Sequence, residues 1–273
     1  MVVGLDWQLV AELLLLGCAT GFLAGLLGVG GGMLMVPFMT LMLAHHGITT
    51  ALAVKMAIAT SMATIMFTSL SSIRAHNSRR AIRWDIVRTL APGITLMALL
   101  TGAFIYPLVK GAALALIFAL LVGFSATQML VNKKPKPTRQ LPGSAGRLVA
   151  GGVIGTVSGL VGAGGGFISV PFMTWCNVPI HNAVATSAAL GFPIALASTL
   201  GNVIGGWSVA NPLPGGVGYL WLPALAVIVT ASMLFAPLGA RAAHAMNMAH
   251  LKRVFALMLY ALAAYMLYKA GAA

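Results

Sequence analysis

Apolar runs of about the length of a membrane-spanning helix recur along the whole chain. The first extends from about residue 9 to residue 27 and contains one charge, Glu12, near its start. A helix needs about 20 apolar residues to cross about 30 Å of hydrocarbon. Similar runs continue to the C-terminus, and the only charge that precedes the first run is Asp6. The pattern therefore predicts a multi-pass membrane protein and not a cleaved signal peptide.

Eight runs are long enough to span a bilayer as helices. They lie near residues 8–28, 57–73, 86–108, 111–131, 147–163, 182–205, 217–239 and 251–269. Two shorter apolar pieces, 33–44 and 167–176, each follow a glycine triplet. Because a 12-residue helix rises only about 18 Å, we expect both pieces to be half-helices.

The chain consists of two copies of one unit. Residues 21–40 (GFLAGLLGVGGGMLMVPFMT) and 155–174 (GTVSGLVGAGGGFISVPFMT) are identical at 12 of 20 positions. A second match follows in the same order, Ala-Ile-Ala-Thr-Ser at 57–61 and Ala-Val-Ala-Thr-Ser at 183–187. Between the matches the first copy is longer, within residues 43–55. The boundaries this predicts are an N-terminal repeat (1–131), a basic, proline-rich linker (132–147) and a C-terminal repeat (148–273).

Basic residues are concentrated in alternate loops, which is the bias of cytoplasmic loops. They are Arg74, Arg79, Arg80, Arg83 and Arg88 after the third segment, Lys133, Lys134, Lys136, Arg139 and Arg147 in the linker, and Arg241, Lys252 and Arg253 further on. The loop at 206–218 has no Lys or Arg. If the linker is inside and this loop outside, an odd number of crossings separates them, so the short piece and its two neighbouring helices must count as three. Each copy then has five crossings, and the N-terminus is outside.

The expected fold is thus an all-α polytopic membrane protein made of two inverted homologous halves. It has eight full transmembrane helices and two short half-helices after the glycine-rich breaks. Composition agrees, because 60% of the residues are hydrophobic and only 7% are charged, against about 25% charged in soluble domains.

The net charge of +13 does not indicate a nucleic-acid partner, since the basic residues occupy short loops that set membrane orientation. The expected partners are the lipid bilayer and a small anionic solute, and a homo-oligomer stays open. Cys18 and Cys176 lie in apolar surroundings, where we expect free buried thiols. No metal-type cluster or cofactor motif is present, so we expect no metal and no cofactor.

Glycine occurs in two patterns. Gly17, Gly21 and Gly25, and equally Gly151, Gly155 and Gly159, recur every four residues, a spacing that lets another helix approach closely. The candidate substrate-binding glycines are a different set at the two breaks, Gly28, Gly30, Gly31 and Gly32 in the first copy and Gly162, Gly164, Gly165 and Gly166 in the second.

Consecutive glycines cost about 1 kcal/mol each inside a helix, and backbone freed within a membrane must find protein or a water-lined cavity. Breaks at equivalent points of inverted copies indicate the central site of a transporter. The half-helix after each break presents unpaired N–H groups and a partial positive charge, which suits an anion. A tight structural turn without a ligand is the alternative.

Paired hydroxyls follow the breaks. Thr60 and Ser61 in the first copy match Thr186 and Ser187 in the second. We expect them to line the site, although hydroxyls in apolar helices often bond to their own backbone instead. Asn202, a polar residue inside an apolar run, is a further candidate, and its counterpart His76 lies among loop arginines.

Function classes can be narrowed by what the spans lack. No Asp or Glu lies in the middle of a predicted span, which disfavours cation transport. An intramembrane enzyme is disfavoured because Ser158-Gly159 lacks the Gly-x-Ser context of a membrane serine protease, and we expect no catalytic residue. A passive anion channel stays open as an alternative to a secondary transporter.

These motifs resemble one family. The doubled glycine-rich motif ending in Pro-Phe, the duplicated Ala-x-Ala-Thr-Ser and the stretch SLSSIRAH at 69–76 resemble the sulfite exporter TauE/SafE family of bacterial inner-membrane permeases. The resemblance implies two homologous halves, a multi-pass location in the bacterial inner membrane, and secondary export or exchange of small anions such as sulfite, sulfonates or organic acids. Substrate, direction and coupling ion stay open.

Overall fold

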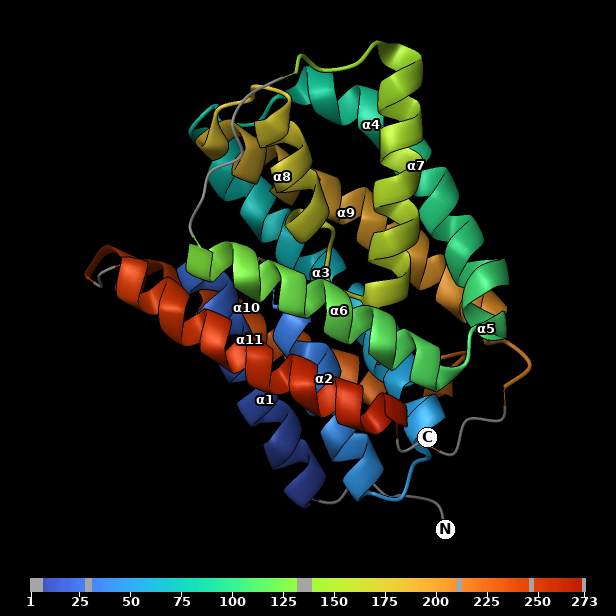
Figure 1. Cartoon of the computed structure of the whole chain (residues 1–273). Coiled ribbons are helices and arrows are strands. Elements are labelled where there is room, and N and C mark those ends of the chain that lie inside the picture. The colour runs from blue at the N-terminus through green and yellow to red at the C-terminus, as the bar shows by residue number, and fades with distance from the viewer. Residues whose placement is uncertain (1–6, 28–30, 132–138, 210–212, 246–247, 272–273) are drawn as a thin grey trace.

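The computed structural model describes residues 7–27, 31–131, 139–209, 213–245 and 248–271. Apart from one short hairpin, these residues form helices joined by turns (Figure 1). The first copy contains α1 (Trp7–Leu27), α2 (Gly32–His45), α3 (Thr50–Ser78), α4 (Trp84–Leu100), the π-helix η1 (Thr101–Ile105), α5 (Tyr106–Leu108) and α6 (Gly111–Val131). The second contains α7 (Ser144–Val161), α8 (Gly166–Trp175), α9 (Ile180–Gly205), β1 (Gly216–Val217), β2 (Leu220–Trp221), α10 (Leu222–Ala245) and α11 (Met248–Gly271).

Among the residues that the structure describes, eight helices are long and apolar enough to cross a membrane, which confirms the predicted spans. α4, η1 and α5 together form one of them. The two pieces after the glycine breaks are α2, with 14 residues, and α8, with 10. At about 1.5 Å per residue, both are shorter than the roughly 30 Å hydrocarbon core.

Two boundaries differ from the sequence prediction. The segment expected as a helix from residue 217 first forms the β1–β2 hairpin, and α10 begins at Leu222. α3 extends over Thr50–Ser78 and not only over 57–73. Both helix ends of α3 are more polar than its centre, so an apolar run marks only the part that lies in hydrocarbon.

The longer stretch of the first copy consists of added helix. α2 is four residues longer than α8 (14 against 10). α3 begins seven residues before Ala57, whereas α9 begins three residues before the matching Ala183. The turn between the helices has four residues in each copy, 46–49 and 176–179. The insertion therefore adds about one turn to each helix of this pair and leaves the connecting loop unchanged.

The copies exchange packing partners (Figure 1). α1 packs along α10, α7 along α4, α3 against α9, and α6 beside α11. A Cβ built at Gly21 would lie 2.4 Å from the Cα of Ser232, and one at Gly155 would lie 2.5 Å from the Ile94 carbonyl oxygen. Gly17 and Gly151 are similarly close to the facing helices, which confirms that these four glycines form packing faces. The contacts of Gly21 and Gly155 also make Ser232 and Ile94 equivalent positions of the two copies.

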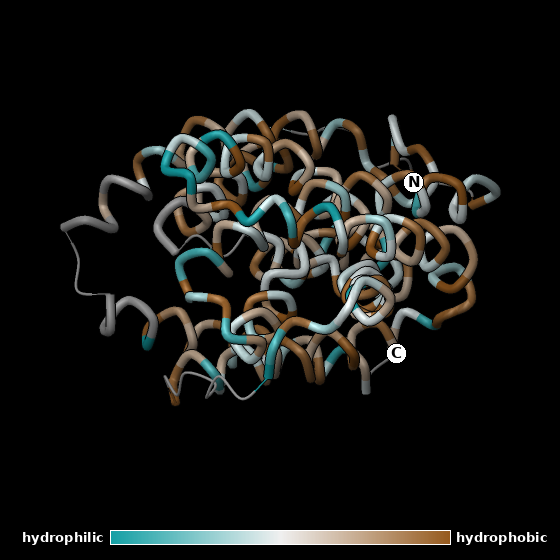
Figure 2. Tube along the Cα trace, turned by 90° about the horizontal axis from the view of Figure 1, so that it is seen from above, coloured by the Kyte–Doolittle hydropathy of each residue, from teal (hydrophilic) through white to brown (hydrophobic). Residues whose placement is uncertain are grey.

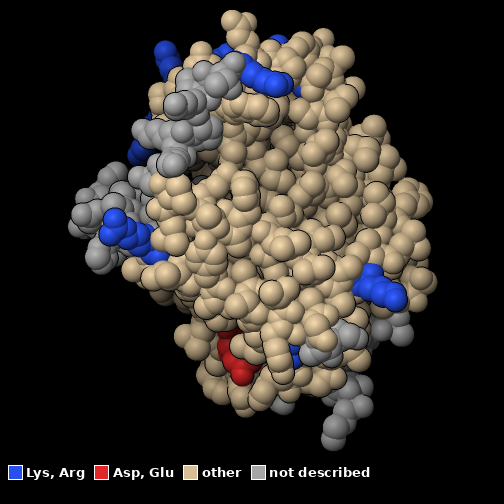
Figure 3. All heavy atoms as spheres, in the orientation of Figure 1, with Lys and Arg blue, Asp and Glu red and all other residues tan. Residues whose placement is uncertain are grey.

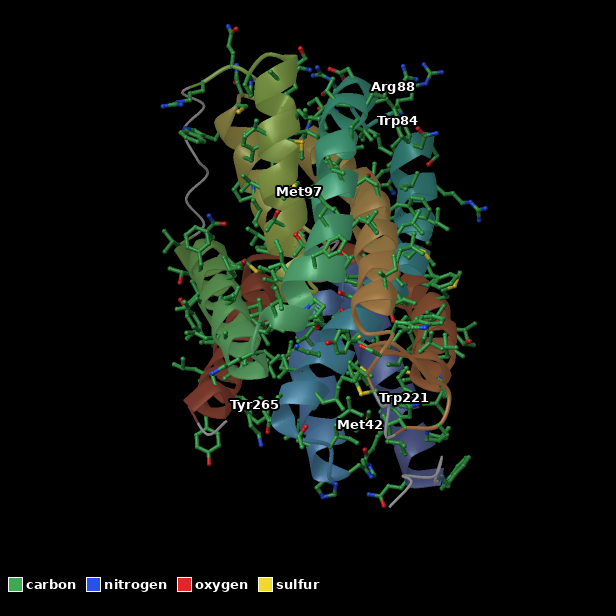
Figure 4. The ribbon with its side chains drawn as sticks, turned by 90° about the vertical axis from the view of Figure 1, so that its right-hand side faces the viewer. Met42, Trp84, Arg88, Met97, Trp221 and Tyr265 are labelled. Atoms are coloured by element: carbon green, nitrogen blue, oxygen red, sulfur yellow. The ribbon has the colours of Figure 1, made fainter. Side chains whose placement is uncertain are left out.

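Charge and hydropathy divide the molecule into two ends and an apolar body. Hydrophobic residues predominate along the trace (Figure 2), and large apolar side chains such as Leu15, Phe104 and Leu120 are exposed on the helices, as expected of a lipid-facing surface. Lys and Arg gather near the end where α4 and α7 begin (Figure 3). Trp84 and Arg88 lie at this end, and Met42 and Trp221 lie toward the other (Figure 4).

Candidate functional site

The second glycine break is a left-handed turn. Gly162 ends α7 and Gly165 precedes α8, and Gly162, Gly164 and Gly165 have φ values of +74°, +73° and +77°. This is the region that favours glycine, because a Cβ would lie too close to the following carbonyl oxygen. In the first break, Gly31 precedes α2, and the candidates Gly28 and Gly30 lie outside the described residues.

The two breaks contact each other, although about 130 residues separate them in sequence. A Cβ built at Gly32 would lie 2.5 Å from the carbonyl oxygen of Gly162. The same oxygen accepts a hydrogen bond of 2.9 Å from the Ser61 hydroxyl of α3. In the second copy, a Cβ at Gly166 would lie 3.4 Å from Oγ of Ser187. Ser61 and Ser187 thus lie beside the breaks.

Thr60 and Thr186 have a different role. Thr60 Oγ1 accepts a 3.3 Å hydrogen bond from the backbone N–H of Trp221, and Thr186 Oγ1 accepts one of 3.0 Å from the N–H of Arg83. Trp221 and Arg83 immediately precede the equivalent helices α10 and α4. Each threonine hydroxyl therefore binds the backbone at the start of a helix in the other copy. The sequence predicted instead that it lines the site or bonds to the backbone of its own helix.

A small cavity lies at the first break, next to the start of α2. Its volume is about 10 Å³, which is about the room needed for one water molecule. The polar part of its wall is formed by the hydroxyl residues Thr20, Thr64, Thr68 and Ser232 beside Gly31 and Gly32. Each hydroxyl donates to a nearby backbone carbonyl and keeps acceptor capacity, and its proton can rotate to another partner.

These four hydroxyl positions are apolar at the second break. The repeat offsets match Thr20, Thr64 and Thr68 with Ile154, Leu190 and Ile194. The glycine contacts match Ser232 of the second copy with Ile94 of the first. All four apolar side chains are buried in one hydrophobic cluster. Ser158 and Ser169, conversely, occupy the positions of Ala24 and Met35. The two breaks therefore have different polar surroundings, and the glycine before each short helix differs in backbone conformation, with φ of −63° at Gly31 and +77° at Gly165.

The hydroxyls at the first break could not be identified from the sequence repeat, because they are not duplicated in the second copy. Thr20, Thr64, Thr68 and Ser232 have no polar counterpart. One signal was nevertheless present, since Thr60, Thr64 and Thr68 recur every four residues and therefore share one face of α3. Ser169 was missed for the same reason, and its hydroxyl lies 2.7 Å from that of Ser187.

Asn202 lies away from the two breaks, further along α9. Its side chain is fully buried, and neither amide atom has a hydrogen-bond partner. Its counterpart His76 is half-buried near the end of α3. The match between the two residues in sequence therefore does not extend to their surroundings.

Lys55 points inward and not toward the surface. Its Nζ donates a 2.9 Å hydrogen bond to the carbonyl of Pro107. The ammonium lies 5.8 Å from the ring centre of Tyr106 and 5.3 Å from that of Tyr219. Lys55 therefore holds α3, α5 and the hairpin region together.

Acidic groups are remote from the breaks. Glu12 pairs with His46 at 3.3 Å, and Asp85 pairs with Arg83 at 2.7 Å, both close to helix ends. Within the described ranges, no three His, Cys, Asp or Glu residues come together as a metal site would require. The surroundings of the breaks are therefore hydroxyls, glycine backbone and apolar side chains.

Three groups in the loops have shifted pKa values. The hydrogen bond to Asp85 raises the pKa of Arg83. Burial raises the pKa of the Cys176 thiol, with Arg139 opposing the shift, and burial also raises the pKa of Tyr219. Each shift keeps the group in its usual state at neutral pH, so the charge of these loops is fixed near pH 7.

Comparisons with known proteins agree with this architecture. The family model "Sulfite exporter TauE/SafE" matches residues 13–266. A "Probable membrane transporter protein" of Haemophilus influenzae is 36% identical over 259 residues, covering 94% of this chain and 97% of the relative. A protein of Methanocaldococcus jannaschii with a similar description is 25% identical over 273 residues, covering 98% of this chain and 100% of the relative. No solved structure matches.

A family match across both copies accounts for the eight apolar helices and the paired glycine breaks together. It also settles the functional class, since the matching family and the relatives are transporters and not enzymes. The chain is a multi-pass membrane protein that belongs to the TauE/SafE sulfite exporter family of membrane transporters.

Proposed function

We propose that this protein is a secondary transporter of small oxyanions, such as sulfite, sulfonates or organic acids, and that the anion binds at the first glycine break. The observation that carries the proposal is the small cavity at the start of α2, which has four hydroxyl residues in its wall and lies where the two breaks meet. Of the second break, Gly162 lies against Gly32 beside the cavity.

Electrostatics favour an anion there. The start of a helix carries a partial charge of roughly +0.5 and N–H groups without helical partners. The carboxylates of Glu12 and Asp85 are paired near helix ends, so they do not cancel this charge. Hydroxyls of Thr20, Thr64, Thr68 and Ser232 can donate to an oxyanion without adding a fixed charge.

We also propose that the copies are inverted and alternate access to the site. The exchange of partners, α1 with α10 and α7 with α4, is what a two-fold axis in the membrane plane would produce. The basic end seen in Figure 3 would face the cytoplasm. The cavity has room for about one water, so binding of an oxyanion requires the helices to separate around it.

Proteoliposome flux tests this function. Purified protein should move sulfite or another member of a panel of sulfur oxyanions and carboxylates, and it should ignore alkali cations and neutral sugars. Saturation and counterflow are expected of a carrier, whereas a passive anion channel, the second candidate, would show neither. Flux of sodium or potassium without any dependence on the anion would refute the proposal.

A pair of equivalent substitutions locates the site. Thr68→Val removes a cavity hydroxyl at constant shape and should lower oxyanion flux about tenfold or more, the worth of one hydrogen bond to a charged group. Ile194→Val, at the matching apolar position of the second copy, should leave flux near the wild-type level. Equal effects of the two changes would place the anion elsewhere.

A further inference from the structure

A second group of polar side chains, on the hairpin side of the breaks, has no partner. Thr101 Oγ1, Ser158 Oγ, Ser198 Oγ and both amide atoms of Asn202 make no hydrogen bond. All four residues are 0% exposed. Hydroxyls such as Thr40, Thr64 and Ser125 return a bond to their own helix. Nearly all buried polar groups in native proteins are paired, so we expect these four side chains to bind a ligand or water.

The four side chains follow one path. A Cβ built at Gly165 would lie 2.9 Å from Oγ of Ser158, which places Ser158 at the second break. A Cβ at Gly159 would lie 3.4 Å from Oγ of Ser198 and 3.6 Å from Cγ2 of Thr101. These contacts connect α7, α9 and η1 at one place next to the break.

The path ends at the hairpin. Asn202 is four residues beyond Ser198 and therefore lies one turn further on the same face of α9. A Cβ at Gly218, between β1 and β2, would lie 3.1 Å from the carbonyl oxygen of Asn202. The unpaired groups thus extend from the second glycine break toward the end of the molecule that the hairpin covers.

Backbone irregularity marks the same path. Thr101 is the first residue of η1, the π-helix that interrupts the span formed by α4 and α5. π-helices are rare and occur often at functional sites. Gly102 of η1 and Gly201 of α9 approach so closely that a Cβ on Gly102 would lie 2.9 Å from the Cα of Gly201. This contact brings Thr101 against the polar face of α9.

The chemistry of the group suits a small oxyanion and its water. Hydroxyls and a carboxamide can both donate and accept, and water can bridge them to a ligand at little cost. The counterparts of Ser198 and Asn202 in the first copy are Ser72, which donates to the Thr68 carbonyl, and half-buried His76. The unpaired, fully buried state of Ser198 and Asn202 is therefore not repeated by Ser72 and His76 in the first copy.

We propose that Thr101, Ser158, Ser198 and Asn202 form a second subsite for the transported oxyanion, between the glycine breaks and the β1–β2 hairpin. The proposal rests on the proposed function and extends it. The cavity at Thr64 and Thr68 and this subsite lie on opposite sides of the breaks, because the hairpin region contacts Thr60, which precedes the cavity hydroxyls on α3, and Asn202, which follows Ser198 on α9. The anion passes between the cavity at the first break and the second subsite as the breaks move apart.

Asn202→Leu and Ser198→Ala test the subsite. Removing a buried polar group that has no protein partner should leave the melting temperature in detergent unchanged or raised. Sulfite flux in proteoliposomes should nevertheless fall at least about tenfold. Ser125→Ala is the control, because Ser125 is buried and bonded to its own helix in α6, and it should keep wild-type flux.

Binding gives a second readout for variants with little flux. Sodium sulfite and potassium sulfite, kept under nitrogen, should each raise the melting temperature of the wild type, as a ligand of the folded state does, and should raise that of Ser198→Ala less. Stabilisation by sodium chloride equal to that by sodium sulfite would show that the oxyanion is not the stabilising ligand and would overturn the subsite. Wild-type flux in both variants, or a lowered melting temperature with unchanged flux, would overturn it and leave the proposed function intact. A wild type that moves no anion of the panel would end both proposals.

Discussion

At the scale of single residues, the neighbours of a side chain decide its role. Gly21 and Gly155 admit another helix, whereas Gly162 and Gly165 adopt a left-handed backbone. Ser61 donates to the opposite break, and the adjacent Thr60 accepts from the start of α10. Sequence alone groups these residues by type, because conformation and partner appear only when the chain is folded.

Gly165→Ala should destabilise the protein. The left-handed conformation costs a non-glycine residue about 1–2 kcal/mol, and the new Cβ would lie 2.5 Å from Cδ1 of Ile194 and 2.9 Å from Oγ of Ser158. Gly123→Ala in α6 is the control, since a Cβ there meets nothing within 4 Å, and it should stabilise by up to about 1 kcal/mol. Thermal unfolding in detergent, followed by circular dichroism, separates the two. Equal melting temperatures would contradict the strained turn.

At the scale of elements, hydroxyls join helices of different copies. α9 holds the start of α4 through Thr186, and α3 holds the start of α10 through Thr60. Asn182 adds a 2.8 Å bond from its side-chain amide to the carbonyl of Ala81, close to the start of α4. These bonds connect the central helices to the outer ones at equivalent places.

Thr186→Val should lower stability by about 1–3 kcal/mol, because the shape is kept while the N–H of Arg83 loses its acceptor. Thr156→Val is the matched control. The Thr156 hydroxyl bonds only to the Gly152 carbonyl of its own helix, so the change should stay within about 0.5 kcal/mol. Melting temperatures of the two purified variants provide the comparison. A loss of the same size in both would mean that the bond between the copies contributes nothing.

The elements could be predicted largely from hydrophobic length, and their ends could not. Eight spans and two short helices follow from apolar runs and glycine triplets, since hydrocarbon thickness fixes the length of a span. The π-helix at Thr101 and the hairpin at 216–221 left no such pattern. The duplicated glycines mark the place where the two breaks contact each other. The unduplicated hydroxyls Thr20 and Ser232 could not be assigned to it, because α1 and α10 meet only in the folded chain.

At the scale of the whole molecule, the two copies form a single packed unit. Neither copy contains the main partner of its own first helix, since α1 packs on α10 and α7 on α4. The two copies therefore have to fold together. The two ends of the molecule also differ in charge. Exposed Arg88 lies at one end (Figure 4), and exposed Arg79 and Arg80 are in the turn between α3 and α4. Glu12 and His46 pair near the other end.

Inversion makes a prediction about sidedness that is independent of any substrate. Ser78, at the end of α3, and Ser208, after α9, are both exposed. α3 and α9 are equivalent helices of the two copies, so an inverted arrangement places their C-terminal ends on opposite faces of the membrane. In a parallel arrangement, both ends would face the same side.

Single cysteines at these two positions distinguish the arrangements. In a Cys18→Ala, Cys176→Ala background, a membrane-impermeant maleimide should label Ser208→Cys in intact cells and label Ser78→Cys only after the membrane is opened. The reason is that the arginines beside Ser78 hold that end in the cytoplasm, while the loop after Ser208 carries no Lys or Arg up to residue 218. Labelling of both cysteines from the same side would rule out inversion. The starts of α2 and α8 would then not be related by a two-fold axis in the membrane plane. The proposed alternating access, which depends on that axis, would then be wrong.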